Sequence, residues 1–136
     1  MPVPDDVLSL LAEDEFVQST TGDSDPPLKT PPQKWFSASV IHLGAPKEKD
    51  LVDEAKGPLR GANVDTFWVF LGTPSGHVLV ATAPVHDLRV LKARWKGYRE
   101  IELLSATAVE CSTVILRFNG ARYEEYSEKS GPIPNC

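Results

Sequence analysis

From Trp35 onward the chain is a succession of short runs rich in aromatic and β-branched residues, separated by glycine, proline or small polar residues. Runs of this length and composition are typical of β-strands. The run TFWVFL is apolar almost throughout, which favours a strand covered on both faces, whereas YREIELL alternates. The other runs are WFSASVIHL, HVLVAT, DLRVLK and STVILRF, and Pro84 divides HVLVAT from DLRVLK. The sequence therefore predicts an antiparallel sheet of about six to eight short strands.

The best-defined turn signal is Asn119-Gly120, which separates STVILRF from the run ARYEEY. A two-residue type I′ turn needs positive φ at both central positions, which Asn tolerates and Gly adopts easily. We therefore expect a tight hairpin with Phe118 and Ala121 paired beside it. This role is structural, not catalytic.

The first 34 residues have a different character from the strand-like body. In PDDVLSLLAEDEFV, Pro4 and Asp5 suit the start of a helix, and one face can be shared by Val7, Leu8, Leu11 and Phe16. Residues 19–34 contain the segment TTGDSDPPLKTPPQ, whose four prolines favour a linker or a surface loop. The prediction is one α+β domain over residues 1–136, predominantly β. A helix in 1–18 packs on the antiparallel sheet, 19–34 is linker, and 35–136 is the β-rich body.

The body contains a weak internal echo. TFWVFLG at 66–72 lies 48 positions before VILRFNG at 114–120, and KDLVD at 49–53 lies about 50 positions before REIEL at 99–103. Echoes with such a period can mark a duplicated β-meander, although sheet proteins also produce them by chance.

Composition excludes several functions. The net charge is −5, and no apolar run approaches the roughly 20 residues needed to cross a bilayer. The densest basic cluster, with aromatics interleaved, lies in 92–99 (KARWKGYR). In an acidic chain, we interpret that cluster as a solvated strand-turn-strand, and we expect no nucleic-acid partner.

The candidate functional residues lie in two glycine-containing loops. The loop GPLRGAN at 57–63 supplies Arg60, Gly61 and Asn63 as binding residues, and the hairpin loop GTPSGH at 72–77 supplies Ser75 and His77. The second loop lacks the Gly-Lys-Ser/Thr ending of a phosphate loop. His42, His77 and His86 show no metal-ligand spacing, so we predict no metal, no cofactor and no catalytic residue.

The C-terminal part of the chain contains the run GYREIEL followed by RFNGARYEEY. This pattern resembles the β-repeat segments of FG-GAP/VCBS-like modules and other small exported bacterial domains. The matching positions lie in the last 40 residues and are Gly97, Tyr98, Glu100, Ile101, Phe118, Asn119, Gly120 and Tyr123. The calcium-binding Asp-rich loops of true FG-GAP repeats are absent, so calcium is not carried over. The resemblance implies an extracytoplasmic setting.

The two cysteines bear on the same question. Cys111 precedes STVILRF, and Cys136 ends the tail SGPIPNC, which its Gly and Pro residues are expected to keep irregular. The hairpin between them doubles the chain back, which favours a Cys111–Cys136 disulfide; two free thiols in a cytoplasmic protein are the alternative. Residues 1–20 do not form a secretory signal, so a periplasmic or secreted location assumes a leader already removed.

We expect a non-catalytic, extracytoplasmic bacterial domain that binds a protein or a surface ligand, in an inhibitor-like or immunity-like role. The alternatives are a small hydrolase whose His and carboxylate groups meet only in the fold, and a structural accessory of an envelope assembly. A deep polar pocket joining His to a carboxylate would favour the hydrolase. A flat or protruding loop surface would favour binding.

Overall fold

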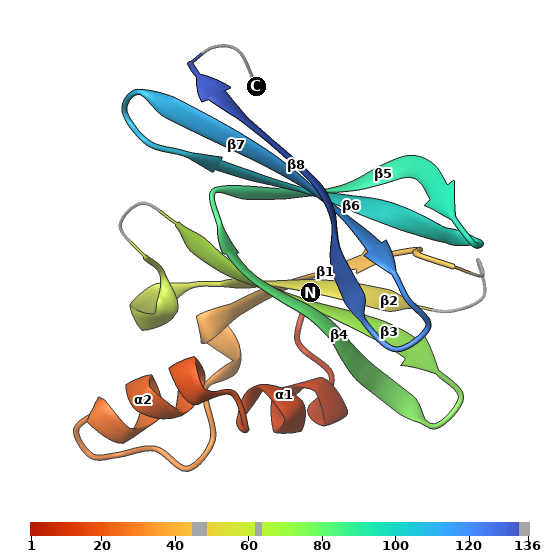
Figure 1. Cartoon of the computed structure of the whole chain (residues 1–136). Helices are drawn as coiled ribbons and strands as arrows, with labels where there is room; N and C mark the ends of the chain where they lie inside the picture. The colour runs from red at the N-terminus through yellow and green to blue at the C-terminus, as the bar shows by residue number, and fades with distance from the viewer. Residues whose placement is uncertain (45–48, 62–63, 134–136) are drawn as a thin grey trace.

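The computed structural model describes residues 1–44, 49–61 and 64–133, and in them two helices and eight strands (Figure 1). The strands form two antiparallel sheets of four. The first sheet has the order β1 (Phe36–Ile41), β2 (Asp50–Ala55), β3 (Asp65–Thr73), β4 (Gly76–Val85). The second has the order β5 (Asp87–Trp95), β6 (Tyr98–Ala106), β7 (Glu110–Phe118), β8 (Tyr123–Pro132). The molecule is thus predominantly β with a small α part, as predicted.

The single sheet that we predicted is in fact two layers. Each sheet is a four-stranded meander, and His86 alone separates β4 from β5. In Figure 1 the second sheet crosses over one face of the first, and the helices lie under the other. The reason is the apolar character of β3: a strand with two apolar faces must be covered on both sides, which one exposed sheet cannot provide.

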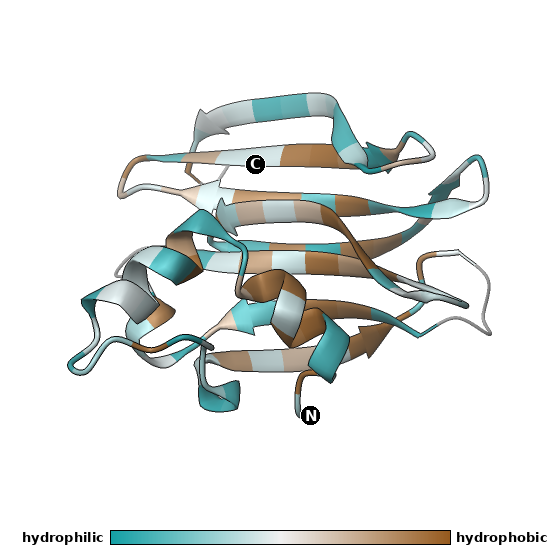
Figure 2. Ribbon diagram, turned by 90° about the horizontal axis from the view of Figure 1, so that it is seen from below, coloured by the Kyte–Doolittle hydropathy of each residue, from teal (hydrophilic) through white to brown (hydrophobic). Residues whose placement is uncertain are grey.

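Two apolar layers result. Phe67 and Val69 of β3 point between the sheets, whereas Trp68 and Phe70 point toward the helices, and all four side chains are buried. Figure 2, viewed from the helix side, shows hydrophobic segments in the strands behind the helices. The layer between the sheets also holds Leu43, Val80, Ala83, Val85, Ile101, Leu103, Leu116, Phe118 and Tyr123. The prediction for TFWVFL is confirmed.

The predicted N-terminal helix is two helices, α1 (Asp5–Leu11) and α2 (Glu15–Asp23). The break occurs because Asp14 caps α2: its Oδ1 accepts hydrogen bonds from the N–H groups of Phe16 (2.9 Å) and Val17 (3.2 Å). Since α2 continues to Asp23, the predicted linker 19–34 is helical at its start and ends in a short 3-10 helix, η1 (Gln33–Trp35). A second 3-10 helix, η2 (Gly57–Leu59), follows β2.

The Asn119-Gly120 turn is structural but not of the predicted type. Phe118 pairs with Tyr123 rather than Ala121, so the loop has four residues. Gly120 has a φ of 101°, and Asn119 does not have positive φ. Instead its Oδ1 accepts from the N–H groups of Ala121 and Arg122, both at 2.9 Å, so the side chain replaces a backbone turn.

A two-residue turn of the expected kind occurs in the basic cluster instead. Lys96 (φ 51°) and Gly97 (φ 90°) connect β5 to β6, and Trp95 pairs with Tyr98. The strand-turn-strand interpretation of this cluster is therefore correct.

Two prolines lie inside strands where we expected them to interrupt one. Pro84 belongs to β4, opposite Thr66, and Pro132 belongs to β8, opposite Glu110. Both strands are sheet edges, where a missing N–H can face outward without breaking the ladder. The tail is therefore regular as far as Pro132.

Neither helix in the described residues is long and apolar enough to cross a membrane.

Candidate binding site

An apolar pocket opens where the helices stop covering the first sheet. It has a volume of about 430 Å³, within the range of ligand pockets. Its floor comes from β3 and β4, and its walls come from α2 and from η2 with the loop after it. Phe16 and Val64 on these walls are 43% and 42% exposed. The lining residues are Asp14, Phe16, Leu59, Gly61, Val64, Thr66, Thr82 and Pro84.

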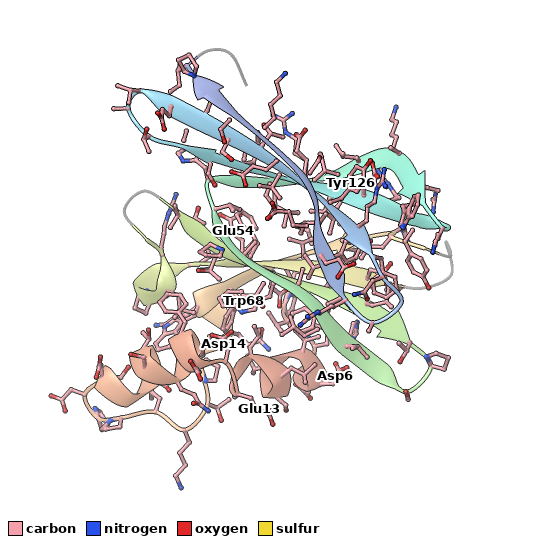
Figure 3. All side chains as sticks on the ribbon, in the orientation of Figure 1. Asp6, Glu13, Asp14, Glu54, Trp68 and Tyr126 are labelled. Carbon is pink, nitrogen blue, oxygen red and sulfur yellow. The ribbon has the colours of Figure 1, made fainter. Side chains whose placement is uncertain are left out.

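Asp14 is the acid in this pocket, but its oxygens are already engaged. Oδ1 caps α2, and Oδ2 accepts a hydrogen bond from the indole Nε1 of Trp68 at 3.0 Å. Figure 3 shows the two side chains together between the helices and the first sheet. A ligand would therefore meet Asp14 as a fixed part of the wall, and the attraction of the pocket is mainly hydrophobic.

A second cavity, of about 520 Å³, runs beside β4. One wall is Leu79, Val80, Ala81 and Thr82, and the other is Arg122, Tyr123 and Glu124 at the start of β8. Thr82 lines both cavities, so they adjoin at this residue. We call the two together the β4 groove.

The predicted binding residues are divided between two places. Gly61 lines the apolar pocket, and Arg60 beside it is exposed with its Nε 3.7 Å from Asp65 Oδ1. Asn63 lies outside the described residues. Ser75 and His77 lie at the other end of β4, and His77 is about 23 Å from Pro84 at 3.3 Å per strand residue. The structure does not bring the two loops together.

His77 is part of a hydrogen-bonded cluster. Asp6 of α1 accepts from the backbone N–H of His77 and pairs with its ring Nδ1, each at 2.8 Å through Oδ2. Burial alone would raise the pKa of Asp6, but these bonds outweigh it and hold the pKa below its usual value. The ring Nε2 of His77 lies 3.3 Å from the carbonyl oxygen of Lys49. The cluster therefore fastens α1 to the first sheet.

Two buried aspartates of β2 differ in whether their carboxylate oxygens are hydrogen-bonded. Asp50 is satisfied: Oδ2 accepts from Leu43 N (2.7 Å) and Oδ1 from Gly72 N (2.8 Å). Asp53 is equally buried, yet neither of its oxygens has a hydrogen-bond partner among the described residues. Burial raises the pKa of Asp53 to about 7, against weaker opposing effects of His77 and the N-terminal ammonium.

No group of three or more His, Cys, Asp or Glu residues in the described chain could hold a metal ion.

Sequence reasoning missed Asp53 and Asp14. The signal for Asp53 was present: in LVDEA it occupies the same alternating face as Leu51 and Ala55, where an acid is out of place. Asp14, three residues after Leu11, is a residue type that commonly caps the start of a helix, but it lies inside a pattern that predicts one continuous helix. Its bond to Trp68, 54 residues away, has no local signal.

A cluster of Arg117 with two aromatic rings and a carboxylate lies on the outer face of the second sheet. The guanidinium carbon of Arg117 lies 4.3 Å from the ring centroid of Trp95 and 3.3 Å from that of Tyr126. Its Nε bonds Glu100 Oε2 at 2.6 Å, so the positive charge is compensated within the sheet.

The chain matches no protein-family profile, no curated protein and no solved structure.

Proposed function

We propose that this chain is a non-catalytic binding domain that takes a protein ligand in the β4 groove. The observation that carries the proposal is the apolar pocket of about 430 Å³, whose rim exposes Phe16 and Val64 from two separate elements. An apolar side chain of a partner that enters this pocket would lose its contact with water and would cover both rim residues.

The pocket can be tested with a small apolar probe, 8-anilinonaphthalene-1-sulfonate, followed by amide chemical shifts. We expect saturable shifts at Phe16, Val64 and Thr82. Phe16→Asp should weaken binding about tenfold, because it replaces an apolar wall by a charge that the first turn of α2 tolerates. Gln18→Asp, at an exposed position of α2 outside the pocket, is the control and should bind normally. Shifts confined to other regions would contradict the proposal.

An extracytoplasmic location belongs to the same proposal, with a cytoplasmic one as its alternative. It is supported by the resemblance to exported β-repeat modules and by the position of Cys111, which pairs in register with Gly131, five residues before Cys136. An inhibitor-like or immunity-like role is the form of binding that a groove of this kind would serve best.

A duplicated β-meander is the proposed origin of the fold. The echo at 66–72 falls in β3 and that at 114–120 falls at the end of β7, each the third strand of its own meander. The second echo likewise relates β2 to β6, the second strands. This agreement supports duplication.

The alternative function, a small hydrolase, has one supporting observation, the pair formed by His77 and Asp6. Both ring nitrogens of His77 face acceptors, at 2.8 Å and 3.3 Å. A general base needs one nitrogen directed at the nucleophile or substrate, so binding remains the function that we propose.

A further inference from the structure

β4 differs from the two edge strands of the second sheet. β5 and β8, the edges of the second sheet, carry four charged residues each: Asp87, Arg89, Lys92 and Arg94, and Glu124, Glu125, Glu128 and Lys129. β4 has ten residues and no Asp, Glu, Lys or Arg, and its Val78 and Leu79 are 46% and 38% exposed. Charges on edge strands prevent pairing with other chains, so β4 lacks this form of protection and has only Pro84 and a β-bulge in its place.

The opposite edge of the first sheet is less accessible. β1 has only six residues, and the N-terminal ammonium donates to the carbonyl oxygen of Ala38 in it. β4 is therefore the edge of this sheet at which a further strand has most room.

Residues 79–82 of β4 line the cavity beside the strand. A β-bulge interrupts the alternation here, because Ala81 pairs with Val69 and Leu79 pairs with Phe70, so the regular part of this edge is the stretch from Ala81 to Val85. Pro84 has no N–H to give to β3 and must occupy an outward position. Thr82, two residues earlier, shares that orientation, so its N–H and C=O point into the groove.

The two sides of the edge offer different chemistry. On the helix side, Thr82 and Pro84 border the apolar pocket. On the side of the second sheet stands Arg122, which has no ion-pair partner in the described part of the chain. Because the side chains of an extended segment alternate between two faces, a segment beside β4 would present one residue to the pocket and the next toward Arg122.

We propose that β4 accepts an extended segment of a partner protein as a fifth strand of the first sheet, with an apolar residue in the pocket and an adjacent acidic residue at Arg122. Main-chain hydrogen bonds to Thr82 give affinity in this mode, and the two side-chain positions give specificity. The inference rests on the proposed binding function and names its partner.

A second copy of the chain is a poorer fit for the same edge. Pairing through β4 of another molecule would bring a whole sheet toward Arg122–Glu124, which stand across the groove from β4. A single extended segment needs only the usual spacing of about 4.8 Å between neighbouring strands.

The test is selection from a displayed library of random 12-residue peptides, followed by affinity measurement of the selected peptides. We expect sequences that alternate apolar and polar residues, with an acid next to the main apolar residue. Thr82→Pro should weaken binding about tenfold, as expected for one lost backbone hydrogen bond, and Thr82→Ser should not.

Three further variants test the proposal without a new proline, in case Thr82→Pro does not fold. Leu79→Lys adds an edge charge and should weaken binding, whereas Val40→Lys on β1, at a position of similar exposure (42%), should not. Arg122→Glu should lose the selected peptides and recover binding when their acid is changed to Lys.

The outcomes separate the two proposals. Peptides lost with Phe16→Asp but unaffected by Thr82→Pro, Leu79→Lys and Arg122→Glu would overturn strand addition and leave the pocket function intact. A library that yields no peptide for the groove would overturn both. If sedimentation shows a dimer that Leu79→Lys dissociates, the edge is occupied by a second copy, and the partner-segment proposal is wrong.

Discussion

Asp53 lies between Leu51 and Ala55 on β2 and shares their buried face in the layer between the helices and the first sheet. With no hydrogen-bond partner among the described residues, its ionised form is strongly disfavoured, and burial raises its pKa to about 7. In the unfolded chain an aspartate loses its proton near pH 4. Between these values the folded protein binds the additional proton.

The stability contributed by this proton is therefore present in acid and is lost as pH rises from about 4 through about 7. We expect the free energy of unfolding of Asp53→Asn to lack this decline, which amounts to roughly 2–4 kcal/mol. Urea unfolding at pH 4.5, 6 and 8 measures it. The half-buried neighbour Glu54, changed to Gln, should keep the wild-type slope (Figure 3). Parallel slopes for Asp53→Asn and wild type would show that Asp53 is ionised in the fold.

Gly120 is a position where backbone conformation determines which residue the chain tolerates. Its φ of 101° is rarely adopted by residues with a Cβ, although an added Cβ would meet no atom within 4 Å. Gly120→Val should lower the free energy of unfolding by about 1–3 kcal/mol from backbone strain alone. Gly22 in α2 also has open space around it but no positive φ, so Gly22→Val should change stability by less than about 1 kcal/mol. Equal melting temperatures for the two variants would refute the strain at Gly120.

At the scale of elements, Asp14 joins α2 to the first sheet. It accepts from two N–H groups at the start of α2 and from the buried Trp68 of β3. Asp14→Ala removes a helix cap and leaves a buried indole N–H unpaired, for an expected loss of about 2–4 kcal/mol. The exposed neighbour Glu13, changed to Ala, should cost less than about 0.5 kcal/mol. Urea midpoints of the two variants check this, and a similar midpoint for both would exclude the joining role.

The cluster of His77 and Asp6 fastens α1 in the same way at the other end of β4. Its loss should affect α1 more than the sheets. We expect Asp6→Asn to accelerate amide hydrogen exchange in residues 5–11 and leave exchange in β6 and β7 unchanged. Uniform acceleration throughout the chain would mean that the helices and sheets open only together.

At the scale of the whole molecule, the two sheets are connected through His86 and the core between them, and a disulfide would fix the far end of the second sheet. The Sγ of Cys111 lies 3.8 Å from the carbonyl oxygen of Gly131, and five further residues can span up to about 17 Å. We predict that Cys111 and Cys136 form a bridge, which stabilises the chain by about 3 kcal/mol in the entropic model. Non-reducing intact mass before and after alkylation measures it, and two alkylated thiols without reductant would contradict both the bridge and the exported location.

The sequence by itself determined the local structure. Alternation and β-branched content predicted the strands, and the apolar TFWVFL predicted a strand covered on both faces, because side-chain period and composition act within a few residues. The Asn119-Gly120 loop shows the limit: the bend was predictable, but Asn119 used its side chain rather than positive φ, a choice between local solutions of similar energy.

Only the tertiary structure decided the rest. The strands divide into two sheets, and the packing of α2 on the first sheet brings Phe16 and Thr82 to one pocket. The hydrogen bonds of Asp14 with Trp68 and of Asp6 with His77 join residues 54 and 71 positions apart. The same holds for Asp53: an acid in an alternating strand is visible in the sequence, but its missing partners depend on which side chains surround it. Such contacts arise when whole faces pack together, and no local pattern specifies which faces meet.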